Sequence, residues 1–227
     1  MAWQSSRGGW LRFHRRAGHY GGGVTEDLRA LGPWDESEVE WDGTERLDLG
    51  SLLIAAAPGV DVQVQVDDAT GAVTLVTLAT ADAGVQIQVF AAPKSGGLWE
   101  ETRKQIASSI NAANGLVEEA QGPFGSELRA QVPAEQGLQP ARFVGIEGPR
   151  WFIRAVFLGT ASRPGSSADE LESAVRGLVV VRGNEAMPVG NPLPLQLPQV
   201  DDGDATHEDP PSALLPPQRG PEITEIR

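Results

Sequence analysis

Hydrophobic and polar residues alternate along two stretches in the first half of the chain. Valine alternates with Asp or Gln over Val60–Val66, and Val or Ile alternates with Gln over Val85–Val89. A period of two is typical of a strand with one buried face and one face in water. Asp and Gly residues separate these stretches from a third strand pattern at Val73–Leu78. Together with the apolar run at 51–58, the three stretches predict an antiparallel meander over Ser51–Ala91.

The period changes to that of a helix in two later segments. We predict a first helix over 97–113, with Gly115 as the residue that ends it. We predict a second helix over 167–178, because Ser167 and Glu170 have the spacing of a capping box. The apolar positions that share a face are Trp99, Ile106, Ala107, Ile110 and Ala113 in the first helix, and Leu171, Ala174, Val175 and Leu178 in the second.

A second series of strand patterns follows the first helix. These strands are predicted at about 116–121, 126–132, 140–147 and 150–158. Between the last two, Gly148 with positive φ followed by Pro149 would suit a type II′ hairpin. The run "VVVRG" from Val179 is either a last short strand or the end of the second helical element, and Met187–Pro198 should lie extended along the surface. The predicted fold class is therefore α+β: an antiparallel sheet with two main helices.

Charge divides the chain into three parts. Residues 1–32 carry five Arg and two acidic residues, 33–198 carry 11 basic and 22 acidic residues, and 199–227 carry two basic and seven acidic residues. We predict a flexible basic extension, a single domain and a disordered acidic, Pro-rich tail, in that order. The chain has no cysteine, and we recognise no secretion signal or membrane span. The predicted location is the cytoplasm.

The composition of the predicted domain restricts its chemistry. The three histidines, His14, His19 and His207, all lie outside residues 33–198. The domain therefore lacks the residues for a Ser–His or Cys–His nucleophile and for an ordinary zinc site. We predict no metal site, no cofactor and no catalytic residue. Nucleic acid is not an expected partner, because affinity for it rests on Lys and Arg that neutralise phosphates.

Arg154 is the most informative charge in the predicted strands. The strand 150–158 is apolar on both faces, which is typical of a central, covered strand. A partly buried arginine needs a partner. One interpretation is an internal ion pair, for which the candidate carboxylates are Glu118, Glu127, Glu45 and Asp48. The alternative is a polar sheet face that binds an anionic or amide-rich partner.

The candidate residues follow from these alternatives. Those proposed for binding are Arg142, Arg150, Arg154, Gln86 and Gln88; those predicted to be structural are Trp99, Trp151, Gly148 and Pro149. Glu147 is expected to pair with Arg150 beside the turn. The stretch Ser95–Trp99 could hold an anion at a helix N-terminus, although Glu100 and Glu101 place negative charge there. A packed strand-to-helix turn is the alternative.

Several segments resemble a known family. They are "VQIQVFAAPKSGGLWEETRKQI", "GPFGSELRAQVP", "ARFVGIEGPRWFIRAVFLG" and "VVVRGNEAMPVGNPLPLQLP", and they resemble the actinobacterial family known as domain of unknown function 3710 over about residues 33–198. The resemblance implies no activity and no site residues. At the level of the fold, the order of elements is similar to the PsbP-like α/β/α sandwich, which does not by itself imply a function.

Three functional hypotheses remain open. The first is a non-catalytic binding or adaptor domain for a protein or small-molecule partner. The second is an enzyme that uses carboxylate or Lys chemistry. The third is peripheral attachment to a membrane through the basic, aromatic residues 1–20.

Overall fold

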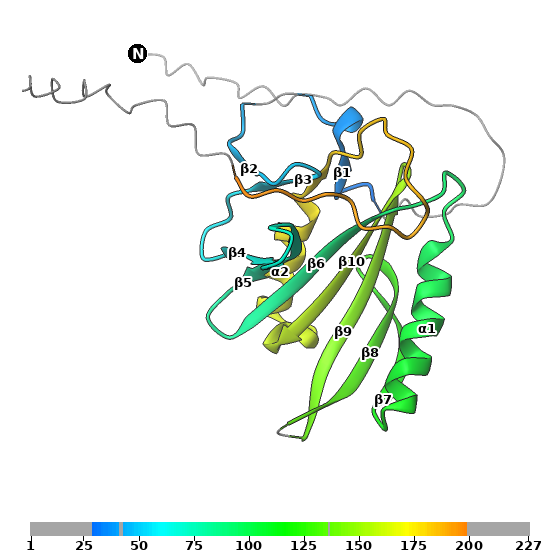
Figure 1. Cartoon of the computed structure of the whole chain (residues 1–227). Helices are drawn as coiled ribbons and strands as arrows, with labels where there is room; N and C mark the ends of the chain where they lie inside the picture. Colours follow the sequence, from blue (N-terminus) through cyan, green and yellow to red (C-terminus); the bar gives the residue numbers. More distant parts are fainter. Residues whose placement is uncertain (1–28, 41–42, 136, 199–227) are drawn as a thin grey trace, which may run out of the picture.

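The computed structural model describes residues 29–40, 43–135 and 137–198 (Figure 1). The predictions made for residues 1–28 and 199–227, including the membrane hypothesis, lie outside the described residues. In the part of the chain that is described, no helix is long and apolar enough to cross a bilayer.

A seven-stranded sheet forms the centre of the fold, and every neighbouring pair of strands in it is antiparallel. In spatial order the strands are β4 (Asp61–Val66), β5 (Val73–Ala79), β6 (Ala83–Ala91), β10 (Trp151–Gly159), β9 (Gly137–Gly148), β8 (Gly125–Ala134) and β7 (Leu116–Gly122). The alternating patterns and turn residues predicted each of these strands to within a few residues. The apolar strand β10 is central, as predicted from its two apolar faces.

A second, four-stranded sheet was not predicted. Its order is β1 (Trp34–Asp35), β11 (Val179–Val180), β3 (Leu52–Ala55) and β2 (Arg46–Asp48). The prediction of one meander over Ser51–Ala91 is therefore wrong at its start, because β3 pairs with β11 and β2 rather than with β4. The pairing of β1 with β11 is parallel.

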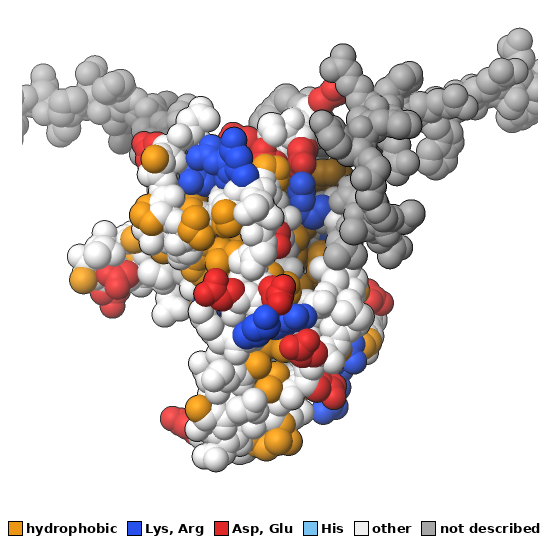
Figure 2. Space-filling view, turned by 90° about the vertical axis from the view of Figure 1, so that its right-hand side faces the viewer, with side chains coloured by type: hydrophobic (Ala, Val, Ile, Leu, Met, Phe, Trp, Pro, Cys, Tyr) orange, Lys and Arg blue, Asp and Glu red, His pale blue; other side chains and the backbone are white. Residues whose placement is uncertain are grey.

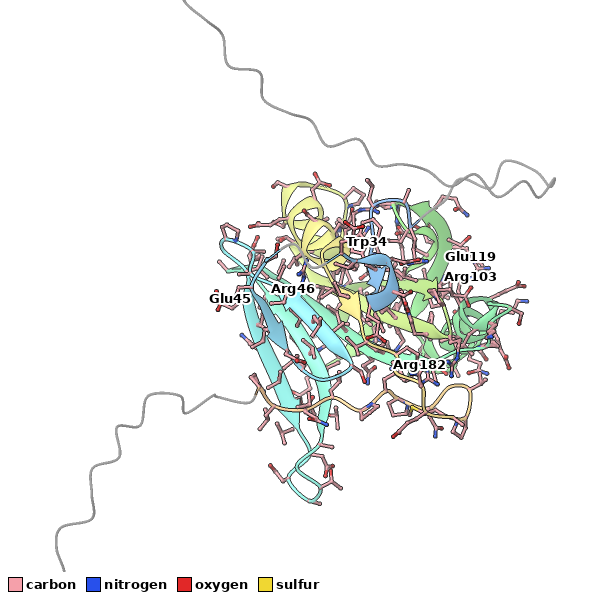
Figure 3. All side chains as sticks on the ribbon, turned by 90° about the horizontal axis from the view of Figure 1, so that it is seen from above. Trp34, Glu45, Arg46, Arg103, Glu119 and Arg182 are labelled. Carbon is pink, nitrogen blue, oxygen red and sulfur yellow. The ribbon has the colours of Figure 1, made fainter. Side chains whose placement is uncertain are left out.

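The two helices lie on opposite faces of the large sheet (Figures 1 and 3). Helix α1 (Leu98–Ala112) contacts β7, β8 and β9, and α2 (Ser166–Arg176) contacts β5 and β6. Both helices were predicted to within two residues. The main core lies on the α2 side, where Leu171 and Val175 pack with residues such as Ile87 and Phe157. Short 3-10 turns at Glu36–Glu38 and Thr160–Ser162 complete the elements.

Several predicted ends of elements differ from the structure. Asn114, with φ 62°, takes the left-handed position after α1, and Gly115 instead provides space, since a Cβ there would meet the Gln131 carbonyl. The N-cap of α2 is Gly165, which has no side-chain cap, so the predicted capping box is wrong. Residues Pro149 and Arg150 form the β9–β10 loop, and Arg150 rather than Gly148 has positive φ.

The segment Met187–Pro198 is a strap between the two sheets. The Leu193 amide donates to the Val89 carbonyl of β6 at 2.8 Å, and the Gln196 amide donates to the Leu49 carbonyl at 2.9 Å. Leu193 and Leu195 are buried in the main core. The segment is extended along the surface, as predicted, but two of its leucines are also part of the core.

Candidate functional site

One face of the large sheet is only partly covered within the described residues. We call it the open sheet face: the side of β4, β5, β6 and β10 that lies opposite α2. Cross-strand register places its side chains in two rows. All of these side chains are exposed or half-buried. The first row is Gln63, Thr77, Gln86 and Val156, and Phe143 of the neighbouring strand β9 ends it beside the Trp99–Phe152 cluster; the second row is Gln65, Leu75, Gln88 and Arg154.

Arg154 lies in the second row and contacts an amide. Its Nη2 donates a hydrogen bond to Oε1 of Gln88, directly across the strand pair. The guanidinium also lies 5.4 Å from the ring centroid of Phe90. Burial lowers the pKa of the Arg154 guanidinium from its ordinary value, because the charged form loses solvation. None of the described carboxylates lies within ion-pair distance, so the predicted internal ion pair is wrong.

Arg142 lies on the other face, beneath α2. Its Nη2 is 2.6 Å from Oε1 of Glu172, and its Nη1 is 3.5 Å from Oε2 of Glu127. Glu127 also pairs with Nε of Arg129 at 3.0 Å. The guanidinium of Arg142 stacks over Phe157 at 4.2 Å. Arg142 thus belongs to a buried ionic network and is separated from Arg154 by the sheet itself.

The β9–β10 turn holds the remaining candidates near the strap. The Arg150 carbonyl accepts hydrogen bonds from Arg182 Nε at 3.1 Å and from the Ala92 amide at 2.9 Å. Gly148 has no room for a Cβ because the Trp151 ring lies against it. Pro149 is exposed at the first loop position, and a following residue with positive φ is typical of a type II turn. The turn is thus held in place by hydrogen bonds to the Arg150 backbone carbonyl.

Trp151 is fully buried and attaches the first residues of the domain to the central strand. Its Nε1 donates to Oδ2 of Asp35 at 2.9 Å. The guanidinium of Arg29 lies 5.4 Å from the Trp151 ring and forms an ion pair of 2.7 Å with Glu38. These contacts extend the packed domain to Arg29, four residues before the predicted boundary at Pro33.

The N-terminus of α1 is occupied by a side chain of the protein. Oε1 of Glu147 accepts the Trp99 amide at 3.1 Å, so Glu147 does not pair with Arg150 as predicted. A carboxylate at this position suits the positive end of the helix dipole. Trp99 is buried, stacks on Phe152 and donates from Nε1 to the Ser126 carbonyl at 2.7 Å. Glu147 thus occupies the place that sequence reasoning considered for an anion.

A groove of about 600 Å³ lies between the small sheet and the edge of the large one. It is lined by Glu45, Arg46 and Asp48 together with apolar residues of β3, β4 and α2. Figure 3 labels Glu45 and Arg46 where the chain enters β2, across the domain from the Arg103–Glu119 pair of α1 and β7. The Asp48 carboxylate accepts the Gly50 amide at 2.7 Å. The described residues contain no cluster of three metal-ligating side chains.

Of the five residues proposed for binding, the structure brings Arg154, Gln86 and Gln88 together on one face, whereas Arg142 lies on the other face and Arg150 in the β9–β10 loop. The sequence did not predict the groove or the Arg142 network. A signal for the network was present: a hairpin that closes at Pro149–Arg150 pairs Arg142 with Phe157 and therefore puts Arg142 on the face opposite Arg154. The groove had no such signal, because its walls come from segments far apart in the sequence.

Figure 2 views the α1 side, where acidic, basic and hydrophobic side chains are interspersed.

Comparisons with known proteins identify the family of this chain. No curated protein matches the chain. Among solved structures, the chain is similar to the solution structure of cyanobacterial PsbP (CyanoP) from Synechocystis sp. PCC 6803, with 10% identity and a TM-score of 0.39, over 60% of this chain and 91% of that one. This likeness is weak and carries over no site. The model of the family described as "Protein of unknown function (DUF3710)" matches residues 32–202, and the chain therefore belongs to that family.

Proposed function

We propose that this domain is a non-catalytic binding module of the cytoplasm that holds a carboxylate-bearing segment of a partner protein on the open sheet face. The observation that carries the proposal is the position of Arg154. It is a half-buried cation on β10, the central strand of the large sheet, and its hydrogen-bond partner among the described residues is the neutral amide of Gln88.

A carboxylate is the ligand that this guanidinium lacks. An arginine has five N–H donors in a fixed plane, and Gln88 accepts a hydrogen bond from Nη2. Donors that stay available can form charge-assisted hydrogen bonds with a carboxylate, which are stronger than neutral ones. The burial that lowers the pKa of Arg154 also reduces the local dielectric screening, so an opposite charge is attracted more strongly here than at an exposed arginine.

The residues around Arg154 favour a peptide segment over a polyanion. Gln86 offers an amide group, while Leu75, Val156 and Phe143 offer half-buried apolar surface in the same two rows. A Glu or Asp flanked by apolar side chains would match both. A polyphosphate or nucleic acid is disfavoured, since residues 33–198 carry 11 basic and 22 acidic residues.

The test is a peptide array probed with labelled protein. It contains peptides in which one Glu lies among apolar residues, each beside its Gln counterpart. The Arg154→Gln variant is compared with Arg163→Gln, which removes the same charge from an exposed residue after the second 3-10 turn. We expect wild type and Arg163→Gln to bind the same Glu peptides, and Arg154→Gln to bind them at least about tenfold more weakly, since removing a charge-assisted hydrogen bond costs about 1.5–3 kcal/mol.

Two outcomes count against the proposal. Binding that the Gln peptides retain would show that the carboxylate is not recognised. Equal weakening by Arg154→Gln and Arg163→Gln would show that net charge, not the open sheet face, is responsible. Thermal unfolding of each variant establishes that it is folded before binding is compared. Fractionation of the native cells tests the proposed compartment: recovery in the cell envelope would contradict it.

A further inference from the structure

A second surface lies at the free edge of β4, the margin of the open sheet face that is farthest from Arg154. This strand is the first in the order of the large sheet and pairs with β5 only. Within the described residues, no chain pairs with its other edge. Asp61, Val62, Gln63 and Gln65 are exposed along it. An edge strand offers a row of backbone N–H and C=O groups to which another strand can add.

The two edges of the large sheet differ in how they are protected. The opposite edge strand, β7, carries Glu118 and Glu119 in its middle and packs against α1. Strand β4 carries its one charge, Asp61, at its first residue. The irregularity in its register lies at the far end, between Gln65 and Val66. Four positions from Val62 to Gln65 are thus left without the charges or helix cover that usually block pairing at an edge.

The groove gives an added strand somewhere to place its side chains. Val62 of β4 and Leu47 of β2 both line it, with Ile54 and Leu78 behind them. A strand that pairs with β4 lies about 4.8 Å away and directs alternate side chains to the inner side of the sheet. Those inner side chains would enter the groove of about 600 Å³ and meet the apolar residues Val62, Leu47 and Ile54 of its lining. An occupant with apolar residues at every second position therefore fits.

The charge at the start of β4 selects the other positions of the occupant. Asp61 alternates with Val62 and therefore lies on the side of the sheet away from the groove, where the outward side chains of an added strand also lie. Opposite charges that face each other across strands are stabilising, and like charges are destabilising. A basic strand is therefore favoured. A second copy of this chain would bring two such acidic edges together.

We infer that the free edge of β4 accepts an extended segment of a partner protein as an added strand, with apolar residues toward the groove and Lys or Arg toward solvent. This differs in location and in ligand charge from the carboxylate site around Arg154. The two proposals therefore stand or fall independently.

The probe is a fluorescein-labelled peptide of alternating Lys and Val, studied by fluorescence polarisation with the full chain. Three comparisons test its mode of binding. One peptide replaces Lys by Glu. Another is N-methylated at every second residue, which removes the backbone donors of one edge and keeps the charge. In the protein, Asp61→Lys is compared with Asp68→Lys, an equal charge change in the exposed β4–β5 loop.

We expect the Lys–Val peptide to bind, and both the Glu–Val and the N-methylated peptides to bind at least about tenfold more weakly. Asp61→Lys should weaken binding several-fold, whereas Asp68→Lys and Arg154→Gln should leave it within about twofold, because those residues lie away from the free edge. Equal binding of the N-methylated peptide would overturn strand addition. Equal weakening by Asp61→Lys and Asp68→Lys would overturn the location. A dimer in sedimentation that Val62→Lys abolishes would identify a second copy as the occupant and overturn the basic partner.

Discussion

Arg142 of β9 and Glu172 of α2 form a buried ion pair, with 2.6 Å between Nη2 and Oε1, that joins the large sheet to the helix beneath it. Glu127 and Arg129 extend this pair into a network of two cations and two anions. Nε of Arg142 is buried without a hydrogen-bond partner among the described residues. The network is thus balanced in charge but not fully satisfied, which makes each member sensitive to loss of another.

Arg142→Met should destabilise the protein strongly. The variant leaves the Glu172 carboxylate without its cation and leaves Glu127 with Arg129 alone, and removal of one partner of a buried pair costs about 3–5 kcal/mol. Urea unfolding measures the difference. Lys104→Met is the control, because the Lys104–Glu100 pair on α1 is exposed on both sides and such a pair contributes about 0.3–0.5 kcal/mol. Similar losses in the two variants would contradict a stabilising role for the network.

Arg154→Met should have a smaller effect than Arg142→Met. No described carboxylate is left unpaired by it, and the lost contacts are the Gln88 hydrogen bond and the Phe90 ring. A hydrogen bond from a charged donor contributes about 1.5–3 kcal/mol. Thermal and urea unfolding of the variant, alone and combined with Gln88→Leu, measure this contribution. A loss as large as that of Arg142→Met would indicate a buried anionic partner and would contradict the assignment of Arg154 to the open sheet face.

Sequence patterns predicted the individual strands and helices of this protein but not which strands pair with each other. Alternation over Val60–Val66 and the helical period after Leu98 are local, so the strands and helices followed from them. Which strand pairs with which depends on residues far apart in the sequence. The short apolar run at Leu52–Ala55 has the same appearance whichever strand it joins, and its actual neighbour β11 lies more than a hundred residues later. The division into two sheets, and the groove between them, could not be predicted for this reason.

Helix α1 depends on a glycine of the sheet. A Cβ on Gly145 of β9 would overlap the indole of Trp99, which holds the first turn of α1 on the sheet through its bond to Ser126. Gly145→Ala should therefore displace Trp99 and cost about 1–3 kcal/mol, as overpacking does. Gly84→Ala is the matched control on β6, where the nearest atoms to a new Cβ are 3.6 Å away.

Near-ultraviolet circular dichroism and tryptophan fluorescence should both change in Gly145→Ala, while Gly84→Ala should retain the wild-type spectra. The control should be neutral or up to about 1 kcal/mol more stable, because Ala loses less conformational entropy than Gly on folding. Unchanged spectra and stability in Gly145→Ala would mean that the close approach of Trp99 to the strand is not needed for the attachment of α1.

The Arg29–Glu38 pair predicts a dependence of stability on pH. The guanidinium of Arg29 donates two hydrogen bonds to the Glu38 carboxylate, at 2.7 and 2.8 Å. This contact, followed by the Asp35 amide and opposed by burial, lowers the pKa of the Glu38 carboxyl from its ordinary value of 4.5. Because the folded state holds the proton less tightly, the unfolded state takes it up first as the pH falls.

The contribution of Glu38 should therefore be complete above about pH 4.5 and should disappear as the pH falls through the lowered pKa. Urea unfolding between pH 7 and pH 3 measures this contribution as the difference between wild type and Glu38→Gln. The difference should be small, since both side chains are partly exposed and solvent screens the pair, and it should shrink toward acid pH. Glu36→Gln, an exposed neighbour in the same turn, controls for general acid effects. If the stability difference between wild type and Glu38→Gln is constant with pH, or grows in acid, then ionised Glu38 does not stabilise the attachment of residues 29–38 to the rest of the domain.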